Sequence, residues 1–113
     1  MSHREWRIRI HDILSAIEKI LSYTHGMTFE DFESDRKTVD AVIRNLIVIG
    51  EASVQLPEEI TEKHRELPWF EMRGLRNFVI HEYFGVSDRI VWDTIHNDLP
   101  PLTALLNHLL DPQ

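Results

Sequence analysis

Apolar residues recur at steps of three and four along most of this chain, and that spacing constrains the fold more than any other feature. In an α-helix such residues form one stripe, which must be buried against another element. Only four glycines and five prolines interrupt the chain, and no alternating strand pattern is present. The sequence therefore predicts an all-α protein: an antiparallel bundle of about four to five helices with short connections.

Helix boundaries follow from residues that begin or end helices. Gly26 ends the first helix, and Asp31 or Ser34 is the expected N-cap of the second. Pro57 and Pro68 each begin a further helix, because proline is tolerated in a first turn. The expected segments are residues 10–21, 29–56, 57–67, 68–84, 87–99 (capped by Ser87) and 100–110, the last being a separate helix or a continuation bent at Pro100 and Pro101.

The middle of the second segment, "VIRNLIVIGEASVQL", is more apolar than one buried face requires. Val42, Ile43, Leu46 and Ile49 form one stripe, while other apolar residues lie off it. A helix that is apolar nearly all round is buried on more than one side. In a chain this small, a second subunit is the simplest cover for the extra side.

Composition sets the class of protein. At 113 residues, 42% hydrophobic and 27% charged, the chain is expected to form one globular domain over residues 1–113. No apolar run is long enough for a membrane span, and the first residues show no secretory signal. The absence of cysteine excludes disulfides and thiolate metal sites. A cytoplasmic protein without a membrane segment is the expectation.

The formal charge of −7 constrains any role with nucleic acid. Non-specific affinity for DNA or RNA comes mainly from neutralising phosphates, so strong general binders are usually basic. RNA contact here would need a local basic site on an acidic surface.

One such site is indicated by "RNFVIHEY", residues 76–83. On a helical wheel Arg76, Asn77, His81 and Tyr83 share one broad face with Arg73, and apolar residues occupy the other half. Arginine matches phosphate oxygens, and histidine transfers protons near neutral pH. These groups can cleave RNA without metal: the 2′-hydroxyl attacks phosphorus, His81 moves a proton and Arg76 stabilises the developing charge.

A single chain carries only one histidine and one arginine on this face, whereas a general acid and a general base together need two groups. A two-fold homodimer would supply both, because an isologous interface places each residue near its symmetry mate. The same spacing also fits residues that only cap, hydrogen-bond or cover the surface, since short motifs produce many false matches.

Other polar residues have plainer interpretations. The seven histidines show no metal-ligand spacing, so no metal site is expected, and those outside the motif are expected at the surface. Arg44 and Glu51 lie on one helical stripe and could interact across two turns or across a dimer, with a structural role favoured over direct chemistry. Arg73 could serve an RNA site or pair with an acidic neighbour. The three tryptophans fit core or interface positions.

The motif also carries a resemblance to a known family. "RNFVIHEY" resembles the Arg-X4-His-X-Tyr motif of the HEPN ribonucleases. "RNLIVIGEA" (44–52), "PWFEMRGLRNFVIHEYFGV" (68–86) and "IVWDTIHNDLPPL" (90–102) are together similar to its HepT branch, in matching order and over nearly the whole chain.

This resemblance implies a helical, homodimeric endoribonuclease toxin whose cleft is lined by the motifs of two subunits. Arg76 and His81 would be catalytic, with Asn77 and Arg73 in support. The implied partner is an MntA-like nucleotidyltransferase antitoxin that attaches AMP to Tyr83. Because the antitoxin consumes the nucleotide, no cofactor is expected in this chain. The alternative is a non-catalytic helical dimer that binds a nucleotidyltransferase or a nucleotide.

Overall fold

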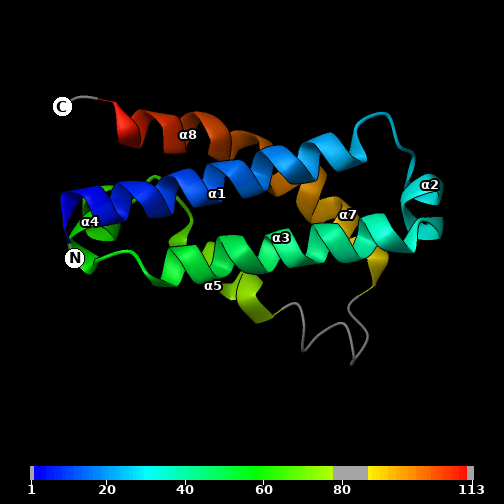
Figure 1. The fold of residues 1–113 in the computed structure, drawn as a ribbon, viewed down its shortest axis with the longest axis horizontal. Coiled ribbons are helices and arrows are strands. Elements are labelled where there is room, and N and C mark those ends of the chain that lie inside the picture. Colours follow the sequence, from blue (N-terminus) through cyan, green and yellow to red (C-terminus); the bar gives the residue numbers. More distant parts are fainter. Residues whose placement is uncertain (1, 78–86, 112–113) are drawn as a thin grey trace.

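The computed structural model describes residues 2–77 and 87–111, and every regular element in these ranges is helical (Figure 1). The all-α prediction is confirmed, but about four to five helices was too few, because some expected helices are divided. None of the described helices is long and apolar enough to cross a membrane. The elements are α1 (His3–Thr24), α2 (Phe29–Ser34), α3 (Arg36–Val54), α4 (Glu58–Lys63), α5 (Trp69–Gly74), the 3-10 turn η1 (Leu75–Asn77), α7 (Asp88–Asp93), the π-helical segment η2 (Thr94–Asp98) and α8 (Pro100–Leu110).

The two long helices, α1 and α3, run antiparallel along the length of the molecule (Figure 1). Each begins at a side chain that accepts from a free N–H of the first turn: Ser2 for α1 and Asp35 for α3. Their facing stripes meet in the core, where Ile17, Leu46 and Ile49 are almost wholly buried. α8 packs on α1, on the side away from α3 (Figure 1).

The expected second helix is two helices. Thr28 and Asp31 form a capping box at the start of α2, in which each side chain accepts from the other residue's backbone N–H. Asp35 then leaves the helical conformation, with φ −98° and ψ 86°, and caps α3. The prediction of Asp31 or Ser34 as the N-cap was therefore wrong: Thr28 and Asp35 hold that position.

α5 and η1 cover α3 on a side away from α1 (Figure 1). Met72 of α5 is buried, and Leu75 of η1 is partly buried against the core. Part of the surplus apolar surface on α3, which the sequence assigned to a second subunit, is thus covered within the chain. Ile47 and Val48 remain partly exposed, and Val54 is 38% exposed.

The last segments form a nearly continuous helical run from Asp88 to Leu110. Leu99, between η2 and α8, keeps helical angles of φ −76° and ψ −42°. The prolines stand in the first turn of α8, where a missing N–H removes no helical hydrogen bond. Of the two possibilities left open by the sequence, the structure has a continuation, with the change of winding in η2.

The core prediction for tryptophan is confirmed at two positions. Trp6 and Trp69 are buried, and the Trp69 indole N–H donates to the His64 carbonyl at 2.9 Å. Trp92 is only partly buried and packs against Phe32, with ring centroids 5.3 Å apart.

At Gly50, η1 lies directly on α3. A Cβ on Gly50 would overlap the backbone nitrogen of Arg76 and lie 3.0 Å from its Cα and its Cβ. Any other residue here would push η1 outward, because backbone atoms cannot rotate away. Gly50 therefore determines how near Arg76 sits to α3.

Replacing Gly50 by alanine should lower the free energy of unfolding by roughly 1–3 kcal/mol, because overlap with the Arg76 backbone outweighs the better helix propensity of alanine. Gly74→Ala is the matched control: nothing lies within 4 Å of its added Cβ. That variant should be neutral or stabilised by up to about 1 kcal/mol. Urea unfolding measures both, and equal stability of the two variants would contradict the close approach.

The Asp35 cap should make stability depend on pH. The Thr38 hydroxyl (2.8 Å) and backbone N–H (3.2 Å) donate to its carboxylate and hold the pKa of Asp35 below its ordinary value. A lowered pKa adds stability above the unfolded-state pKa, and this is lost as pH falls through the folded-state pKa. Asp35→Ala should therefore destabilise at neutral pH and progressively less in acid. Ser87→Ala, which removes a hydroxyl cap from α7, should show no such pH dependence.

Candidate functional site

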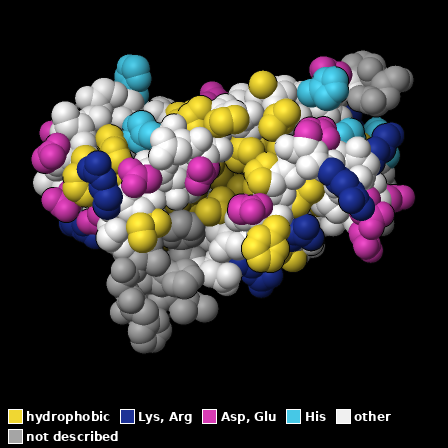
Figure 2. All heavy atoms as spheres, turned by 180° about the vertical axis from the view of Figure 1, so that it is seen from behind, with side chains coloured by type: hydrophobic (Ala, Val, Ile, Leu, Met, Phe, Trp, Pro, Cys, Tyr) yellow, Lys and Arg dark blue, Asp and Glu magenta, His cyan; other side chains and the backbone are white. Residues whose placement is uncertain are grey.

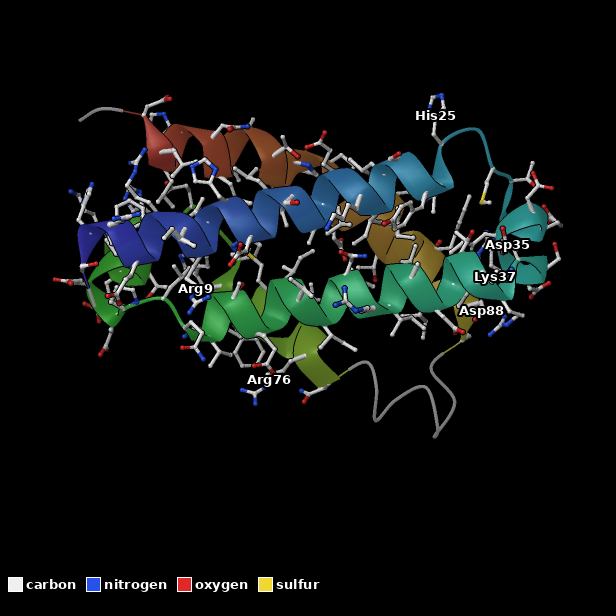
Figure 3. The ribbon with its side chains drawn as sticks, in the orientation of Figure 1. Arg9, His25, Asp35, Lys37, Arg76 and Asp88 are labelled. Atoms are coloured by element: carbon white, nitrogen blue, oxygen red, sulfur yellow. The ribbon has the colours of Figure 1, made fainter. Side chains whose placement is uncertain are left out.

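Arg76 lies at the outer edge of the molecule, at the end of the α5–η1 segment (Figure 3). Its side chain is 46% exposed, so the guanidinium can meet a ligand from solvent. The chain changes from α-helix to 3-10 helix immediately before it, after Gly74.

His81 and Tyr83 lie outside the described residues, which resume at Ser87. The predicted grouping of these two side chains with Arg76 therefore stays a prediction. Asn77, the last residue before this interval, is exposed at the end of η1.

Arg73 lies one 3-10 or α-helical turn before Arg76 and is also exposed. Its Nε donates to the Trp69 carbonyl at 3.2 Å. Residues three apart lie on the same side of such a turn, so Arg73 and Arg76 place two positive charges on one edge of the molecule. This edge is a local basic site of the kind that contact with RNA would need on a chain of net charge −7.

Glu51 is the acidic partner of Arg76. The Arg76 Nε lies 3.3 Å from the Glu51 Oε1, and both side chains are about half exposed at 46% and 53%. Glu51 projects from α3 one residue after Gly50, so the close approach of η1 brings the pair together. The sequence allowed Glu51 to interact with Arg44 across two turns of α3 or across a dimer. The ion pair within the chain does not occur, and the one across a dimer stays a prediction. The fold joins Glu51 to Arg76, 25 residues away in the sequence.

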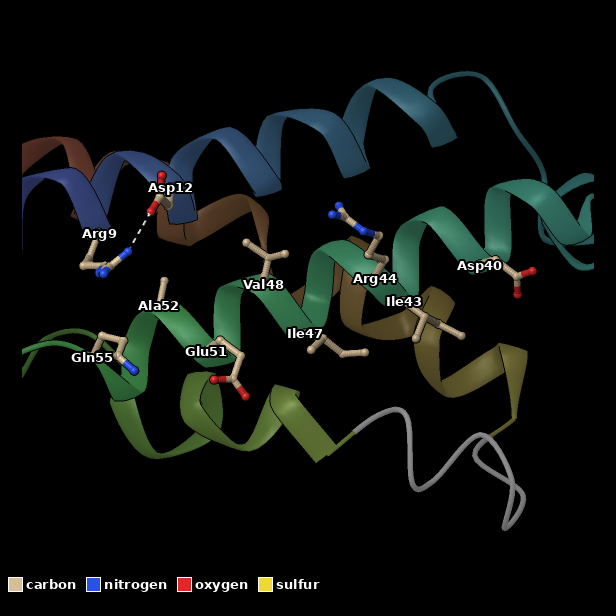
Figure 4. A pocket seen from close by; sticks show the side chains of 10 residues that line it. All are labelled: Arg9, Asp12, Asp40, Ile43, Arg44, Ile47, Val48, Glu51, Ala52 and Gln55. Carbon is tan, nitrogen blue, oxygen red and sulfur yellow. Dashed lines mark ion pairs between the residues drawn. The ribbon is translucent and has the colours of Figure 1, made fainter.

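A groove of about 840 Å³ opens beside this pair, between α1 and α3 (Figure 4). Its walls combine an aliphatic strip on α3 with charged residues of both signs. Arg9 and Asp12 of α1 approach to 3.6 Å at one end. The lining residues are Arg9, Asp12, Asp40, Ile43, Arg44, Ile47, Val48, Glu51, Ala52 and Gln55.

A second hollow of about 330 Å³ lies between α5 and the η2–α8 segment. On the face opposite to that of Figure 1, hydrophobic side chains gather in a depression (Figure 2). Met72, Leu75, Leu99 and Leu102 are among its lining residues, with Asp98 and Glu71 at its edge. It contains no arginine or histidine, so it lacks the groups that would bind a phosphodiester.

The histidines differ from expectation at one position. His64 was expected at the surface but is buried; its ring lies 3.4 Å from Glu66. His96 is exposed, and its Nδ1 lies 2.9 Å from the Trp92 carbonyl. In residues 2–77 and 87–111 no three histidine, aspartate or glutamate side chains converge as metal ligands.

The sequence is similar to one family of known proteins over most of its length. The family model described as ribonuclease HepT-like matches residues 13–109. The chain is 46% identical over 108 residues to the probable ribonuclease HepT of Thermococcus cleftensis, covering 96% of each chain. It is 43% identical over 100 residues to a candidate RNase of Methanocaldococcus jannaschii, covering 88% of this chain and 83% of the relative.

A candidate RNase of Caldanaerobacter subterraneus subsp. tengcongensis is 40% identical over 104 residues, covering 92% of this chain and 93% of the relative. No solved structure matches the chain significantly. Arg76, with its acidic partner Glu51, falls inside the segment that the family model spans. Since that model and these relatives all extend over most of its length, the chain belongs to the HepT-like ribonuclease family.

Proposed function

We propose that this protein is a metal-independent endoribonuclease that acts as a homodimer and serves as the toxin of a toxin–antitoxin pair. Membership of the HepT-like ribonuclease family supports the reaction class. The observation that carries the proposal at the level of the site is the exposed Arg76, held at the edge of the molecule by backbone packing on Gly50.

Arg76 is suited to bind the scissile phosphate. Its guanidinium is permanently charged and can donate two parallel hydrogen bonds to phosphoryl oxygens. Glu51 contacts Nε, which leaves the terminal nitrogens of the guanidinium available to a ligand. A guanidinium oriented before substrate arrives loses less conformational entropy on binding.

The reaction needs no nucleophile from the protein. The ribose 2′-hydroxyl attacks the adjacent phosphorus while its proton passes to a histidine, and a second histidine protonates the departing 5′-oxygen. Arg76 stabilises the charge that develops on the non-bridging oxygens. The products are a 2′,3′-cyclic phosphate and a 5′-hydroxyl. His81 of each subunit of the homodimer supplies one of the two proton-transfer groups.

Inhibition by the antitoxin follows from the same charges. An MntA-like nucleotidyltransferase would transfer AMP from ATP to the Tyr83 hydroxyl, releasing pyrophosphate. The added phosphodiester places negative charge two residues from His81, where the RNA phosphate must bind. Repulsion and occupancy then exclude substrate.

Arg76→Ala and His81→Ala should each reduce cleavage of a labelled RNA by about 10²-fold or more, because charge stabilisation or proton transfer is lost. Wild-type cleavage should persist in EDTA and leave cyclic-phosphate ends. Arg89→Ala is the control, since Arg89 is also an exposed arginine in an ion pair with a carboxylate, Asp93 of α7. Cleavage retained by both site variants would refute the proposal, and a folded protein without any cleavage would favour the binding-dimer alternative.

Tyr83→Phe should escape modification when the protein is incubated with an MntA-type nucleotidyltransferase, ATP and Mg²⁺. The chain contains two tyrosines, so Tyr23→Phe, on α1 and 43% exposed, is the matched control and should still be modified. Peptide mass spectrometry locates the added AMP. Finding it on Tyr23, or on the residue 83 peptide of the phenylalanine variant, would exclude Tyr83 as the acceptor.

A further inference from the structure

The groove between α1 and α3 carries a pattern that the ribonuclease site itself does not explain. Eight of its lining residues form one helical stripe at alternating steps of three and one; seven belong to α3, and the eighth, Gln55, is its C-cap. Aliphatic residues occupy the middle of the stripe and polar residues its ends (Figure 4). In chain order the stripe is Asp40, Ile43, Arg44, Ile47, Val48, Glu51, Ala52 and Gln55.

The charges on this surface suit a protein partner better than RNA. The charged residues that line the groove comprise three acids and two bases, so they offer no excess positive charge to a phosphate backbone. Ile47 and Val48 are partly exposed at the centre, and charged groups surround them. An apolar centre with a polar rim is the usual composition of a protein–protein interface. Arg44 and Asp40 form no ion pair with any described residue.

We infer that a second copy of this chain occupies the groove, with its α3 antiparallel to the first and the two-fold axis between Ile47 and Val48. Antiparallel reversal about that point pairs every residue of the stripe with a suitable partner. Ile47 meets Val48 of the partner subunit at the centre. Ile43 lies across from the partner's Ala52, and each of these two residues is only 6% exposed in the single chain. Arg44 meets Glu51 of the partner subunit, and Asp40 meets the partner's Gln55.

The residue types, rather than their spacing, select this register. A stripe with steps of three and one has the same positions when reversed, so spacing alone permits several registers. Sliding the partner by one turn in one direction places Asp40 against the partner's Glu51, which repel. One turn in the other direction sets Arg44 against Gln55 and Glu51 against Val48 of the partner subunit. Only the register centred between residues 47 and 48 joins base to acid and large to small aliphatic residues.

A residue from α1 adds a second pair of opposite charges across the proposed interface. Arg9 lies beside the Ala52–Gln55 end of the groove, and Asp40 lies at the opposite end (Figure 4). The two-fold axis exchanges these ends, so Arg9 of the partner subunit approaches Asp40. Both ends of an isologous interface then carry complementary charges.

The interface also extends the ribonuclease site, and in this respect it rests on the proposed function. Glu51 uses Oε1 for Arg76 of its own chain, which leaves Oε2 for the partner's Arg44. Glu51 would thus lie between two guanidiniums, one catalytic and one from the other subunit. This arrangement makes Arg44 and Glu51 positioning residues that act through Arg76, and it brings the Arg76 edges of both subunits to one interface.

Exchange of charges tests the register. Arg44→Glu alone sets glutamate against the partner's Glu51, and Glu51→Arg alone sets arginine against the partner's Arg44. Each homodimer should have a Kd raised by about tenfold or more over wild type. An equimolar mixture should instead form heterodimers, because each interface then contains two opposite-charge pairs. Native mass spectrometry with one variant isotope-labelled distinguishes the species, and sedimentation equilibrium gives the Kd values.

The double variant, with both changes in one chain, separates assembly from chemistry. Its homodimer should return to near the wild-type Kd, whereas its RNA cleavage should stay low because Arg76 now faces arginine instead of Glu51. Arg89→Glu makes the same change of charge on α7, outside the groove, and should leave the Kd unaltered. The proposed interface would be refuted if the wild-type protein is a monomer. It would also be refuted if the single variants keep the wild-type Kd and form homodimers and heterodimers in random proportions.

Failure of the interface and failure of the ribonuclease proposal are distinguishable. If the two variants form selective heterodimers but the wild-type protein does not cleave RNA, the interface is supported and the ribonuclease proposal is refuted. If the wild-type protein cleaves RNA but its Kd for dimerisation does not change with these substitutions, the ribonuclease proposal is supported and the interface is refuted.

Discussion

The contact of η1 with α3 at Gly50 is the constraint on which the candidate site depends. Because glycine has no Cβ, the backbone of Arg76 can lie directly on the surface of α3. Glu51, the next residue of α3, then reaches the Arg76 guanidinium at 3.3 Å. Backbone packing therefore sets where the Arg76 side chain begins, and the Glu51 carboxylate favours one direction for its guanidinium.

The ion pair alone is too weak to fix Arg76. Half-exposed pairs are screened by water and salt and contribute about 0–1 kcal/mol. Burial in the dimer interface that we infer would lower the local dielectric and strengthen the pair. It would also supply Arg44 of the partner subunit as a second cation. Under that arrangement the arginine is best ordered only in the assembled dimer, so assembly and activity are coupled through one carboxylate.

The overall acidity of the chain is compatible with action on RNA because the positive charge is local. Arg73 and Arg76 share one edge, while the groove next to them has mixed charge. Such a protein would have little general affinity for nucleic acid and would depend on the scissile phosphate and its neighbours. The mixed-charge surface is then available for a partner protein.

The sequence by itself determined the helical class and most helix starts, because these depend on periodicity and proline positions that act over a few residues. It also singled out Arg76 as a candidate, from residue chemistry alone. It did not reveal the break at Asp35 between α2 and α3. That break is set by local caps, Thr28 with Asp31 and Asp35 with Thr38, which the periodicity of apolar residues does not register. The burial of His64 depends instead on packing between distant segments.

Only the tertiary structure decided the partner of Glu51. The helix wheel relates residues of one helix and so offered Arg44, whereas the observed ion pair joins α3 to η1. No local pattern marks Gly50, and its role follows from the fold, which places the Arg76 backbone on it. Contacts between elements depend on how whole helices pack, and no local spacing encodes that geometry.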